Sequence, residues 1–303
     1  MRVGVSLTSG RRADDPRRGA THMVDRTKAA WNAGLESLFV GDHHSTPGAY
    51  YQNVPMMGRL LAEWGDRPAG CLFLFPLWNP VLLAEQVGTL AAIARGRFIV
   101  QCGLGDGADQ FGAMGVQIKT RPSTFEQAFD AVTRLLAGET VTMTGRFTFE
   151  NARVVLRPAE PVEYWIAASA DPAIDRAARL ADGWLASPGL VPAEAKRQID
   201  YYRARCATYG RTPTAIAIRR DIYVGDSAAD VNAVAGPAVA GGYRGFDPAA
   251  LIAGTVDQVA EKFAEFAGMG YTDVIVRHLT DDQRHVLGSY ERLARVRHAV
   301  AAA

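Results

Sequence analysis

Short apolar runs alternate along the whole chain with longer segments in which apolar residues recur at helical spacing. The run at 71–75, CLFLF, is apolar without interruption, which is typical of a parallel strand that is buried on both faces. The pattern predicts strands at 3–7, 37–40, 71–75, 97–102, 164–167, 184–186, 216–224 and 274–276. It predicts helices at 21–34, 54–64, 80–95, 123–137, 172–181, 193–209, 227–240, 255–268 and 281–300.

Strands that alternate with helices predict a parallel sheet, and eight such units in 303 residues favour closure into a (β/α)8 TIM barrel. We expect one barrel domain over residues 1–303, with insertions after strands four and seven. The first insertion is a predicted β-hairpin at 141–156, and the second contains a flexible stretch at 241–247. An open doubly wound sheet is the competing fold, but residues 8–12, TSGRR, do not form the phosphate loop of that fold.

Two helix starts carry the spacing of a capping box, in which a hydroxyl residue precedes Glu or Gln by three positions. Ser123 with Glu126 predicts the start of the helix after strand four, and Thr255 with Gln258 predicts the start of a helix in the second insertion.

Composition narrows the class of protein without assigning a function. Hydrophobic residues make up 48% of the chain and the net charge is +1, so no global field favours nucleic acid or an anionic membrane. The chain has no apolar run long enough for a transmembrane helix, and its start, MRVGVSL, is typical of a strand rather than a secretory signal. The three cysteines match no metal-binding spacing, so we expect a reduced, cytoplasmic protein.

Polar residues gather at the predicted strand ends, where a barrel of this kind builds its active site. Strand two ends GDHH, strand three PLWN, strand four GLGD, strand five Ala168-Ser169 and strand eight Arg277-His278. Three of the six histidines are therefore expected at one rim, which predicts an enzyme.

Each of these features also has a structural interpretation. A metal site at His43 and His44 is disfavoured, because adjacent strand residues point to opposite faces. Asp42 beside His43 fits either acid–base chemistry or simple orientation of the ring. The glycines at 103 and 105 fit a turn as well as a ligand cradle. Ser169 fits either a phosphate site at a helix N-terminus or an ordinary N-cap.

Four stretches, taken in order, resemble the bacterial-luciferase-like monooxygenase family. They are AGCLFLFPLWNPVLLAEQVGTLAAIARGRF at 69–98, IVQCGLGDGADQFGAMGV at 99–116, ARLADGWL at 178–185 and GTVDQVAEKFAEFAGMGYTDVI at 254–275. The resemblance covers nearly the whole chain. It implies a TIM barrel with a flavin across its C-terminal mouth.

The resemblance also assigns residues by position. Asp42 and His43 would be the catalytic pair, with His43 as proton donor or acceptor, and Cys71-Leu72 would be the place of a non-prolyl cis peptide under the ring. The remaining cofactor-binding assignments are Cys102, Gly103 and Leu104 along the ring and its ribityl chain, and Arg121, Ala168 and Ser169 around the phosphate.

The cofactor stays open between reduced FMN and coenzyme F420. Luciferase-type enzymes often have Glu-His-His where this chain has Asp42-His43-His44, and Asp-His is commoner in relatives that use coenzyme F420. A cysteine followed by an aliphatic residue, as at 71–72, also occurs among them. Cys102 replaces the arginine that luciferase has in strand four.

The leading functional hypothesis is a flavin-dependent oxidoreductase, a luciferase-like monooxygenase that oxidises a small organic substrate with reduced FMN and oxygen. The alternative is hydride transfer by a coenzyme F420-dependent reductase or dehydrogenase. A non-catalytic flavin-binding protein and a cofactor-free hydrolase or aldolase are weaker hypotheses. By resemblance, we expect a homodimer and, as a partner, a separate flavin reductase. The segment 236–247 is expected to form a mobile cover. The roles of Arg219, Arg220, Arg277 and His278 stay open.

Overall fold

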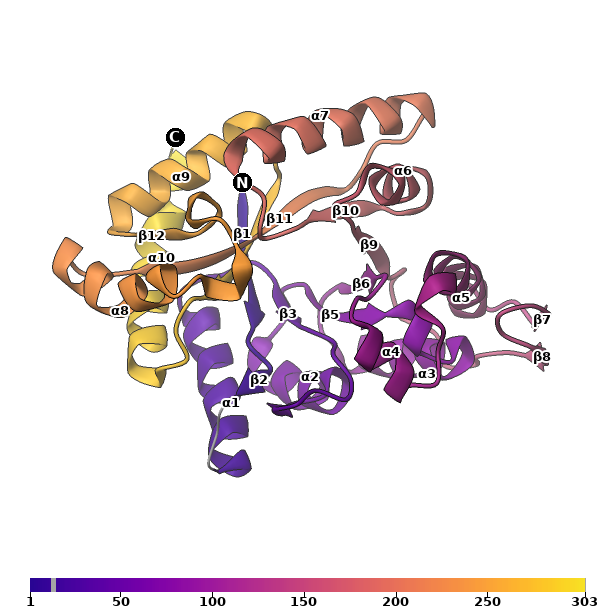
Figure 1. Cartoon of the computed structure of the whole chain (residues 1–303). Helices are drawn as coiled ribbons and strands as arrows, with labels where there is room; N and C mark the ends of the chain where they lie inside the picture. Colours follow the sequence, from indigo (N-terminus) through magenta and orange to yellow (C-terminus); the bar gives the residue numbers. More distant parts are fainter. Residues whose placement is uncertain (12–14, 303) are drawn as a thin grey trace.

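Eight parallel strands form a closed ring in the computed structural model, which describes residues 1–11 and 15–302 (Figure 1). In ring order they are β1 (Arg2–Leu7), β3 (Leu38–Val40), β5 (Ala69–Leu74), β6 (Phe98–Gly103), β9 (Glu163–Ala167), β10 (Gly183–Ala186), β11 (Ala215–Val224) and β13 (Asp273–His278). Pairing of β10 with β11 closes the ring, and every pairing within it is parallel. The predicted (β/α)8 barrel and its eight strands are confirmed.

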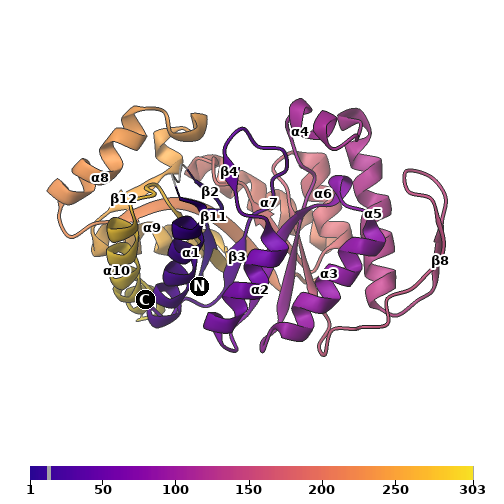
Figure 2. The same cartoon turned by 90° about the horizontal axis from the view of Figure 1, so that it is seen from below.

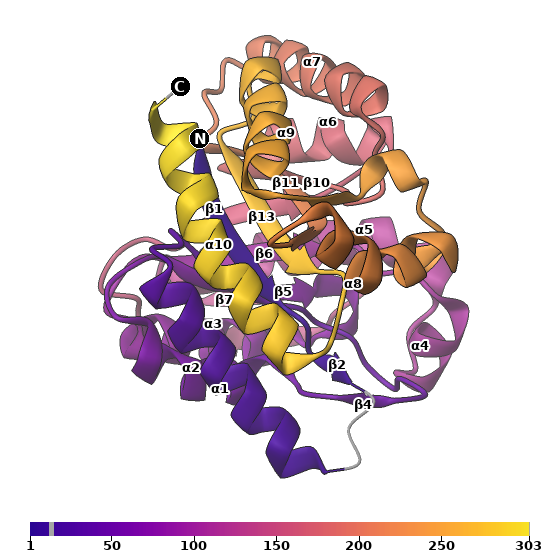
Figure 3. The same ribbon diagram turned by 90° about the vertical axis from the view of Figure 1, so that its left-hand side faces the viewer.

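A layer of helices surrounds the strands and buries their outward-facing side chains. It consists of α1 (Pro16–Asn32), α2 (Asn53–Trp64), α3 (Pro80–Ile93), α5 (Arg121–Leu136), α6 (Asp171–Leu180), α7 (Pro192–Thr208), α9 (Val256–Met269) and α10 (Gln283–Ala302). Figure 3 shows α10 packed between α1 and α9, so that the last helix closes the outer layer against the first.

The remaining elements are excursions from the barrel. The antiparallel pair β7 (Val141–Met143) and β8 (Phe149–Ala152) confirms the predicted hairpin and projects away from the barrel in Figure 1. Helix α8 (Ala228–Ala240) precedes two short 3-10 helices, η3 (Tyr243–Gly245) and η4 (Pro248–Ala250), and strand β12 (Ile252–Gly254). The short β2 (Gly10–Arg11), β4 (Ala49–Tyr50), α4 (Ala108–Ala113), η1 (Phe75–Leu77) and η2 (Ile118–Thr120) were not expected. Figure 2 shows β2, β4, α4 and α8 on one side of the barrel and the N-terminus, where β1 begins, on the other.

One of the two predicted capping boxes forms. The backbone N–H of Thr255 donates to Gln258 Oε1 at 2.9 Å, as the motif requires. The box at Ser123 and Glu126 is wrong. Helix α5 already begins at Arg121, and the Glu126 carboxylate instead accepts a hydrogen bond of 2.8 Å from Arg176 Nε.

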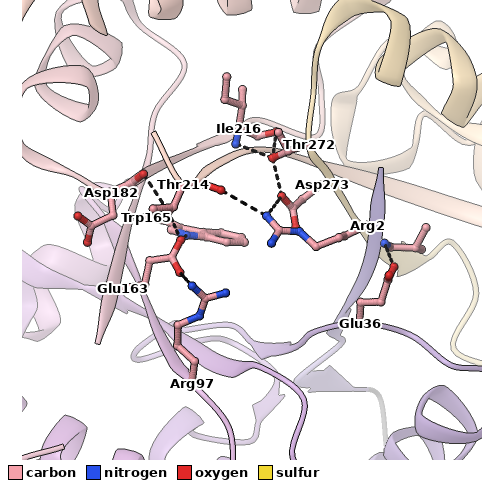
Figure 4. Close-up of polar contacts among 11 residues, drawn as sticks. Arg2, Glu36, Arg97, Glu163, Trp165, Asp182, Thr214, Ile216, Thr272 and Asp273 are labelled. Carbon is pink, nitrogen blue, oxygen red and sulfur yellow. Dashed lines mark hydrogen bonds and ion pairs between the residues drawn. The ribbon is translucent and has the colours of Figure 1, made fainter. Parts of the chain in front are cut away.

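The barrel interior is closed from below by two layers. The first is an apolar cluster of inward-facing side chains: Phe39, Ile99, Trp165, Leu185, Ala215, Ala217 and Ile275. Beneath it lies a polar floor at the N-terminal ends of the strands (Figure 4). There Trp165 Nε1 donates to Glu163 at 2.8 Å, and Arg97 pairs with the same carboxylate at 2.8 Å. Arg2 pairs with Asp273 at 2.7 Å beside them. Because side chains fill the N-terminal end of the barrel, a ligand would enter the barrel from its C-terminal mouth. Barrels of this class place their active sites there.

No helix within residues 1–11 and 15–302 combines the length and the apolar character that crossing a membrane requires.

Candidate active site at the C-terminal mouth

A cavity of about 450 Å³ opens at the C-terminal ends of the strands. One group of its lining side chains is apolar and comprises Leu72, Leu74, Leu104, Ala167, Ala168, Ala173, Leu185, Ala186 and Ile275. A second group is polar and comprises Ser6, Gln101, Asp106, Arg121, Ser169, Ser187, Arg219 and Arg277. An apolar slot with a few convergent polar groups is the usual form of a small-molecule site.

The corner of the cavity beside α6 suits an anion. Helix α6 begins at Asp171 with Ala170 as its N-cap, so no side chain caps its first turn and Ser169 is not the N-cap. The exposed Ser169 lines the cavity together with Arg121, which stands at the start of α5. Arg121 Nη1 lies 3.5 Å from the exposed carboxylate of Asp106. A free helix N-terminus, a hydroxyl and a guanidinium are the groups that bind phosphate in proteins.

The turn after β6 requires its glycines. A Cβ on Gly103 would lie 2.9 Å from Leu74 Cδ2, and Gly105 has a φ of +76° that L-residues rarely adopt. The turn presents Leu104 to the cavity and keeps the backbone close to it. A flat ring would therefore meet backbone and leucine side chains along this wall.

Asp42 is a buried anchor at the end of β3. Its Oδ2 accepts hydrogen bonds from the Leu74 N–H and from Trp78 Nε1, both at 2.8 Å. Its Oδ1 lies 3.2 Å from Nε2 of His44. The carboxylate is thus paired with His44 rather than with His43, and it ties the ends of β3 and β5 together.

His43 stands exposed at the rim, next to the cavity but not among the side chains that line it. Its ring packs beside Tyr50, with 6.0 Å between the ring centroids. Partial burial lowers the pKa of His43 below 6.5; the Asp42 charge opposes this shift, and His44 and Arg244 add to it. At neutral pH the ring is uncharged and has a lone pair available, as a proton acceptor requires.

The cysteines predicted beside the cofactor face away from the cavity. Cys71 and Cys102 are buried in the layer between strands and helices, and their neighbours Leu72 and Gly103 are the residues that line the cavity. Burial raises the pKa of both thiols well above its usual value. The peptide bond between Cys71 and Leu72 is trans, like the others in the described part of the chain, so the expected cis peptide is wrong.

Two residues whose roles the sequence left open, His278 and Arg220, have structural roles. His278 lies under α10, with its ring 4.6 Å from that of Tyr290, so the expectation of three histidines at the mouth is wrong for His278. Arg220 is fully buried on the outer face of β11, where it donates to the Pro188 carbonyl at 2.9 Å and lies over the Phe266 ring.

Sequence reasoning missed Ser6, Gln101 and Ser187 among the polar side chains that line the cavity. Strand alternation is the signal that could have found Gln101, because it lies between the outward-facing Val100 and Cys102. Ser187 directly follows β10, so the rule applied to the other strand ends would have found it.

Closed-barrel topology and a cavity built from strand ends place the chain among the (β/α)8 barrels whose site lies at the C-terminal mouth. The model of a family described as luciferase-like monooxygenase matches residues 1–251. The chain therefore belongs to the luciferase-like monooxygenase family, and the resemblance inferred from its motifs is confirmed.

The individual relatives reported next share less than a third of their aligned residues with this chain. An F420-dependent glucose-6-phosphate dehydrogenase from Nakamurella multipartita is 27% identical over 192 residues, which cover 60% of this chain and 57% of that enzyme. Limonene 1,2-monooxygenase from Rhodococcus erythropolis is 29% identical over 174 residues, covering 56% of this chain and 45% of that enzyme. The match thus spans about half the length of these relatives. A monooxygenase from Streptomyces bottropensis has the same fold, with a TM-score of 0.84, 20% identity and coverage of 97% of this chain and 98% of that one.

Proposed function

We propose that this chain is an oxidoreductase that binds a phosphate-bearing flavin-type cofactor across the barrel mouth and oxidises a small organic substrate. Reduced FMN with oxygen, as in a monooxygenase, is the leading form of this proposal. The observation that carries it is the shape of one cavity, in which an apolar slot ends at an uncapped helix N-terminus beside Arg121 and Ser169.

The residues present fit such a cofactor. Leu72, Leu74 and Leu104 would hold its flat ring, and the α6 N-terminus with Ser169 and Arg121 would hold its phosphate. When bound, reduced FMN would supply the electrons that activate oxygen, whereas coenzyme F420 would carry a hydride.

The chain's own residues would position the substrate and exclude water. The apolar wall keeps solvent from the reacting centre, which limits loss of reactive species to water. His43 would accept or donate a proton on the substrate at its free ring nitrogen. Asp42 would act through His44 and the ends of β3 and β5 rather than on the substrate.

The cover of the site is proposed to be the segment 236–247. Phe246 packs against Gly189 after β10, where an added Cβ would lie 3.0 Å from the Phe246 ring. Tyr243 faces Asp221 of β11, and burial together with that carboxylate raises the pKa of Tyr243 to about 12. These two contacts are the attachment points of the proposed cover, so Phe246→Ala should increase the release of reduced oxygen species without product formation. Unchanged coupling in that variant and after deletion of the segment would rule the cover out.

Hydride transfer with coenzyme F420 is the second candidate. It is favoured by the F420-dependent relative and by the Asp42-His43 sequence at the end of β3. The proposed phosphate end of the cavity would serve both cofactors, so the site geometry alone favours neither. In this case His43 would act as acid or base on the substrate oxygen.

Titration of the purified chain with FMN and, separately, with coenzyme F420, followed by fluorescence, tests the proposal. We expect tight binding of one cofactor and a loss of at least tenfold in affinity in an Arg121→Ala, Ser169→Ala variant. The matched control is Arg95→Gln, which removes an exposed arginine at the opposite end of the barrel. Binding of neither cofactor would overturn the proposal.

Oxygen consumption by the reduced holoenzyme then separates the two chemistries. Rapid consumption supports the monooxygenase, and hydride transfer without it supports the dehydrogenase. Retained cofactor with no redox turnover of any substrate would identify a flavin-binding protein instead.

We also propose a homodimer and, for the FMN form, a separate flavin reductase. Helix α3 exposes two large apolar side chains, Leu82 at 46% and Ile93 at 50%, and a neighbouring segment exposes Val155 and Leu156. Light scattering on the double variant Leu82→Glu, Ile93→Glu should show a monomer where the unmodified chain shows a dimer.

The three buried, unpaired cysteines suit a reducing compartment, and we propose the cytoplasm.

A further inference from the structure

Two arginine side chains enter the cavity from neighbouring strands. Arg219 on β11 and Arg277 on β13 both line it, and the register pairs Asp221 with Arg277 across the two strands. They stand above the apolar layer that contains Ala217 and Ile275, their inward-facing predecessors on the same strands. Both guanidinium groups therefore lie in the part of the barrel that a ligand can reach.

The two groups have unequal partners. Arg219 Nε donates to the fully buried carboxylate of Asp221 at 3.1 Å. Among the residues that the structure describes, Arg277 Nη2 donates only to the neutral Ser6 hydroxyl, at 2.8 Å, and the buried Arg277 Nε has no hydrogen-bond partner. Within the described ranges, no carboxylate pairs with Arg277. Of the two guanidinium groups, only that of Arg219 is thus paired with a carboxylate in the described part of the chain.

Other nearby groups do not supply the missing anion. Asp42 is already engaged by Leu74, Trp78 and His44. Tyr50 places its hydroxyl close to the Arg277 Nη2 atom, since both approach the same face of Gly41, but burial raises the pKa of Tyr50 and keeps it neutral. Burial and the Arg277 charge together lower the pKa of Arg219 to about 9, as expected for a site with excess positive charge.

Buried charge without a counterion is unfavourable, and proteins keep it where a ligand completes the pairing. An arginine with free donors directed into a cavity binds planar or tetrahedral oxyanions through two parallel hydrogen bonds. Arg121 lies with Ser169 at the α6 corner of the cavity, on elements that follow β6 and β9, whereas β11 and β13 carry this second pair. The cavity thus has two cationic regions, of which the cofactor phosphate would use one.

We propose that Arg277, with Arg219 beside it, binds an oxyanion group of the substrate, which is therefore an organic carboxylate, sulfonate or phosphate. This inference rests on the proposed function, because it assigns the substrate class for the same cavity. The anion would enter the region between β1, β11 and β13 and take up the free Arg277 donors.

Calorimetric titration with benzoate, methanesulfonate and inorganic phosphate tests the proposal, with benzamide as the neutral counterpart of benzoate. We expect at least one anion to bind and benzamide to bind at least tenfold more weakly than benzoate. Arg277→Gln and Arg219→Gln should each weaken anion binding at least tenfold. Arg95→Gln removes the same charge at the far end of the barrel and should leave anion binding unchanged.

Cofactor titration of the same variants distinguishes this inference from the proposed function. Arg277→Gln should bind FMN or coenzyme F420 within about twofold of the unmodified chain. Anion binding that is lost in Arg121→Ala but kept in Arg277→Gln would place the anion at the cofactor's phosphate corner and overturn the inference. Cofactor binding that fails in Arg277→Gln would overturn it as well, and so would absence of binding by all three anions at tens of millimolar.

Thermal unfolding without added anion separates ligand binding from a structural role. Removing an incompletely paired charge should leave the melting temperature of Arg277→Gln within about 2 °C of the unmodified chain or raise it. An anion should stabilise the unmodified chain and not the variant. A fall of more than about 5 °C in the variant would assign Arg277 to the fold instead.

Discussion

Oδ1 of Asp42 lies 3.2 Å from Nε2 of His44, although His43 is its neighbour in the sequence. The other oxygen of the same carboxylate holds the end of β5 and the Trp78 indole. The first of the two consecutive histidines at this strand end, His43, is thus exposed, whereas the ring of His44 is half-buried and lies against the Asp42 carboxylate. Their chemical roles should separate in the same way.

Replacing each histidine by glutamine should give opposite results. His44→Gln should lower the stability by about 1–3 kcal/mol, because the buried Asp42 carboxylate loses the ring nitrogen that lies 3.2 Å from its Oδ1. His43→Gln should leave stability within about 0.5 kcal/mol and reduce kcat at least a hundredfold. Denaturant unfolding and steady-state kinetics of the two variants give both values. Equal effects of the two substitutions on kcat would contradict the division of roles.

The pH dependence of turnover should report the neutral form of His43. Burial lowers the pKa of His43 below 6.5, so its ring stays uncharged from neutral pH down to below that value. If the ring accepts a proton, kcat/KM should fall only on the acid side of 6.5, and His43→Gln should abolish that limb. Arg244→Gln removes a charge that contributes to the shift, so it should move the limb to higher pH. An acid limb that persists in His43→Gln would assign it to another group.

A substitution in the polar floor should lower the stability of the chain without changing its activity. Glu163→Gln keeps an acceptor for Trp165 but loses the ion pair with Arg97, so we expect a loss of about 1–3 kcal/mol. Because this end is remote from the mouth, kcat and cofactor affinity should stay within about twofold. Glu160→Gln, at an exposed position, is the control and should change stability by less than about 0.5 kcal/mol. A matching loss of kcat at a temperature where the Glu163→Gln variant is fully folded would show that the floor shapes the site.

Acid should destabilise the chain through His278. Burial, with a contribution from the Arg26 charge, lowers the pKa of His278 to about 3, whereas the unfolded value is near 6.5. The unfolded state therefore takes up a proton first as the pH falls through 6.5, while the folded state stays neutral until about 3. Stability should fall at up to about 1.4 kcal/mol per pH unit in this window, and this contribution is absent above 6.5.

His278→Asn tests this by comparing the free energy of unfolding at about pH 7.5 and pH 5 for each protein. The variant should lose about 1–2 kcal/mol less over that interval than the unmodified chain, whatever its stability at neutral pH. His298→Asn, on the exposed side of α10, should keep the full pH dependence. If His278→Asn loses as much unfolding free energy between the two pH values as the unmodified chain does, His278 is already protonated or accessible in the folded state.

The barrel could be predicted because its strands are short, mainly apolar segments that alternate with helical segments, a pattern typical of a parallel sheet covered on both faces. Elements of two or three residues, such as β2, β4 and β12, carry too few positions to show any periodicity. The box at Ser123 failed because Pro122 allows the helix to start earlier and because Glu126 has two arginine partners, Arg176 and Arg179, which are remote in sequence.

The sequence placed Leu72, Gly103, Leu104, Arg121, Ala168 and Ser169 at the mouth, and all six line the cavity, whereas Cys71 and Cys102 face away from it. Strand ends locate a mouth, whereas the face that each side chain takes depends on the alternation within the strand. Alternation along β5 places Cys71 on the face opposite to Leu72, and therefore away from the cavity. The same alternation along β11 places Arg219 inside the barrel and Arg220 outside it. The pairing of Asp42 with His44 depends on the backbone path of the loop, which no local pattern specifies.

One further contact joins the two sides of the mouth. The buried side chain of Gln110, on α4, accepts a hydrogen bond of 2.7 Å from the His44 N–H and donates one of 3.0 Å to the carbonyl of Asp106. The loop that carries His43 and the glycine turn after β6 are therefore linked through the side-chain amide of Gln110. A cofactor that orders the turn would lower the entropy of the histidine loop at the same time, so cofactor and substrate should bind with positive cooperativity that Gln110→Ala removes.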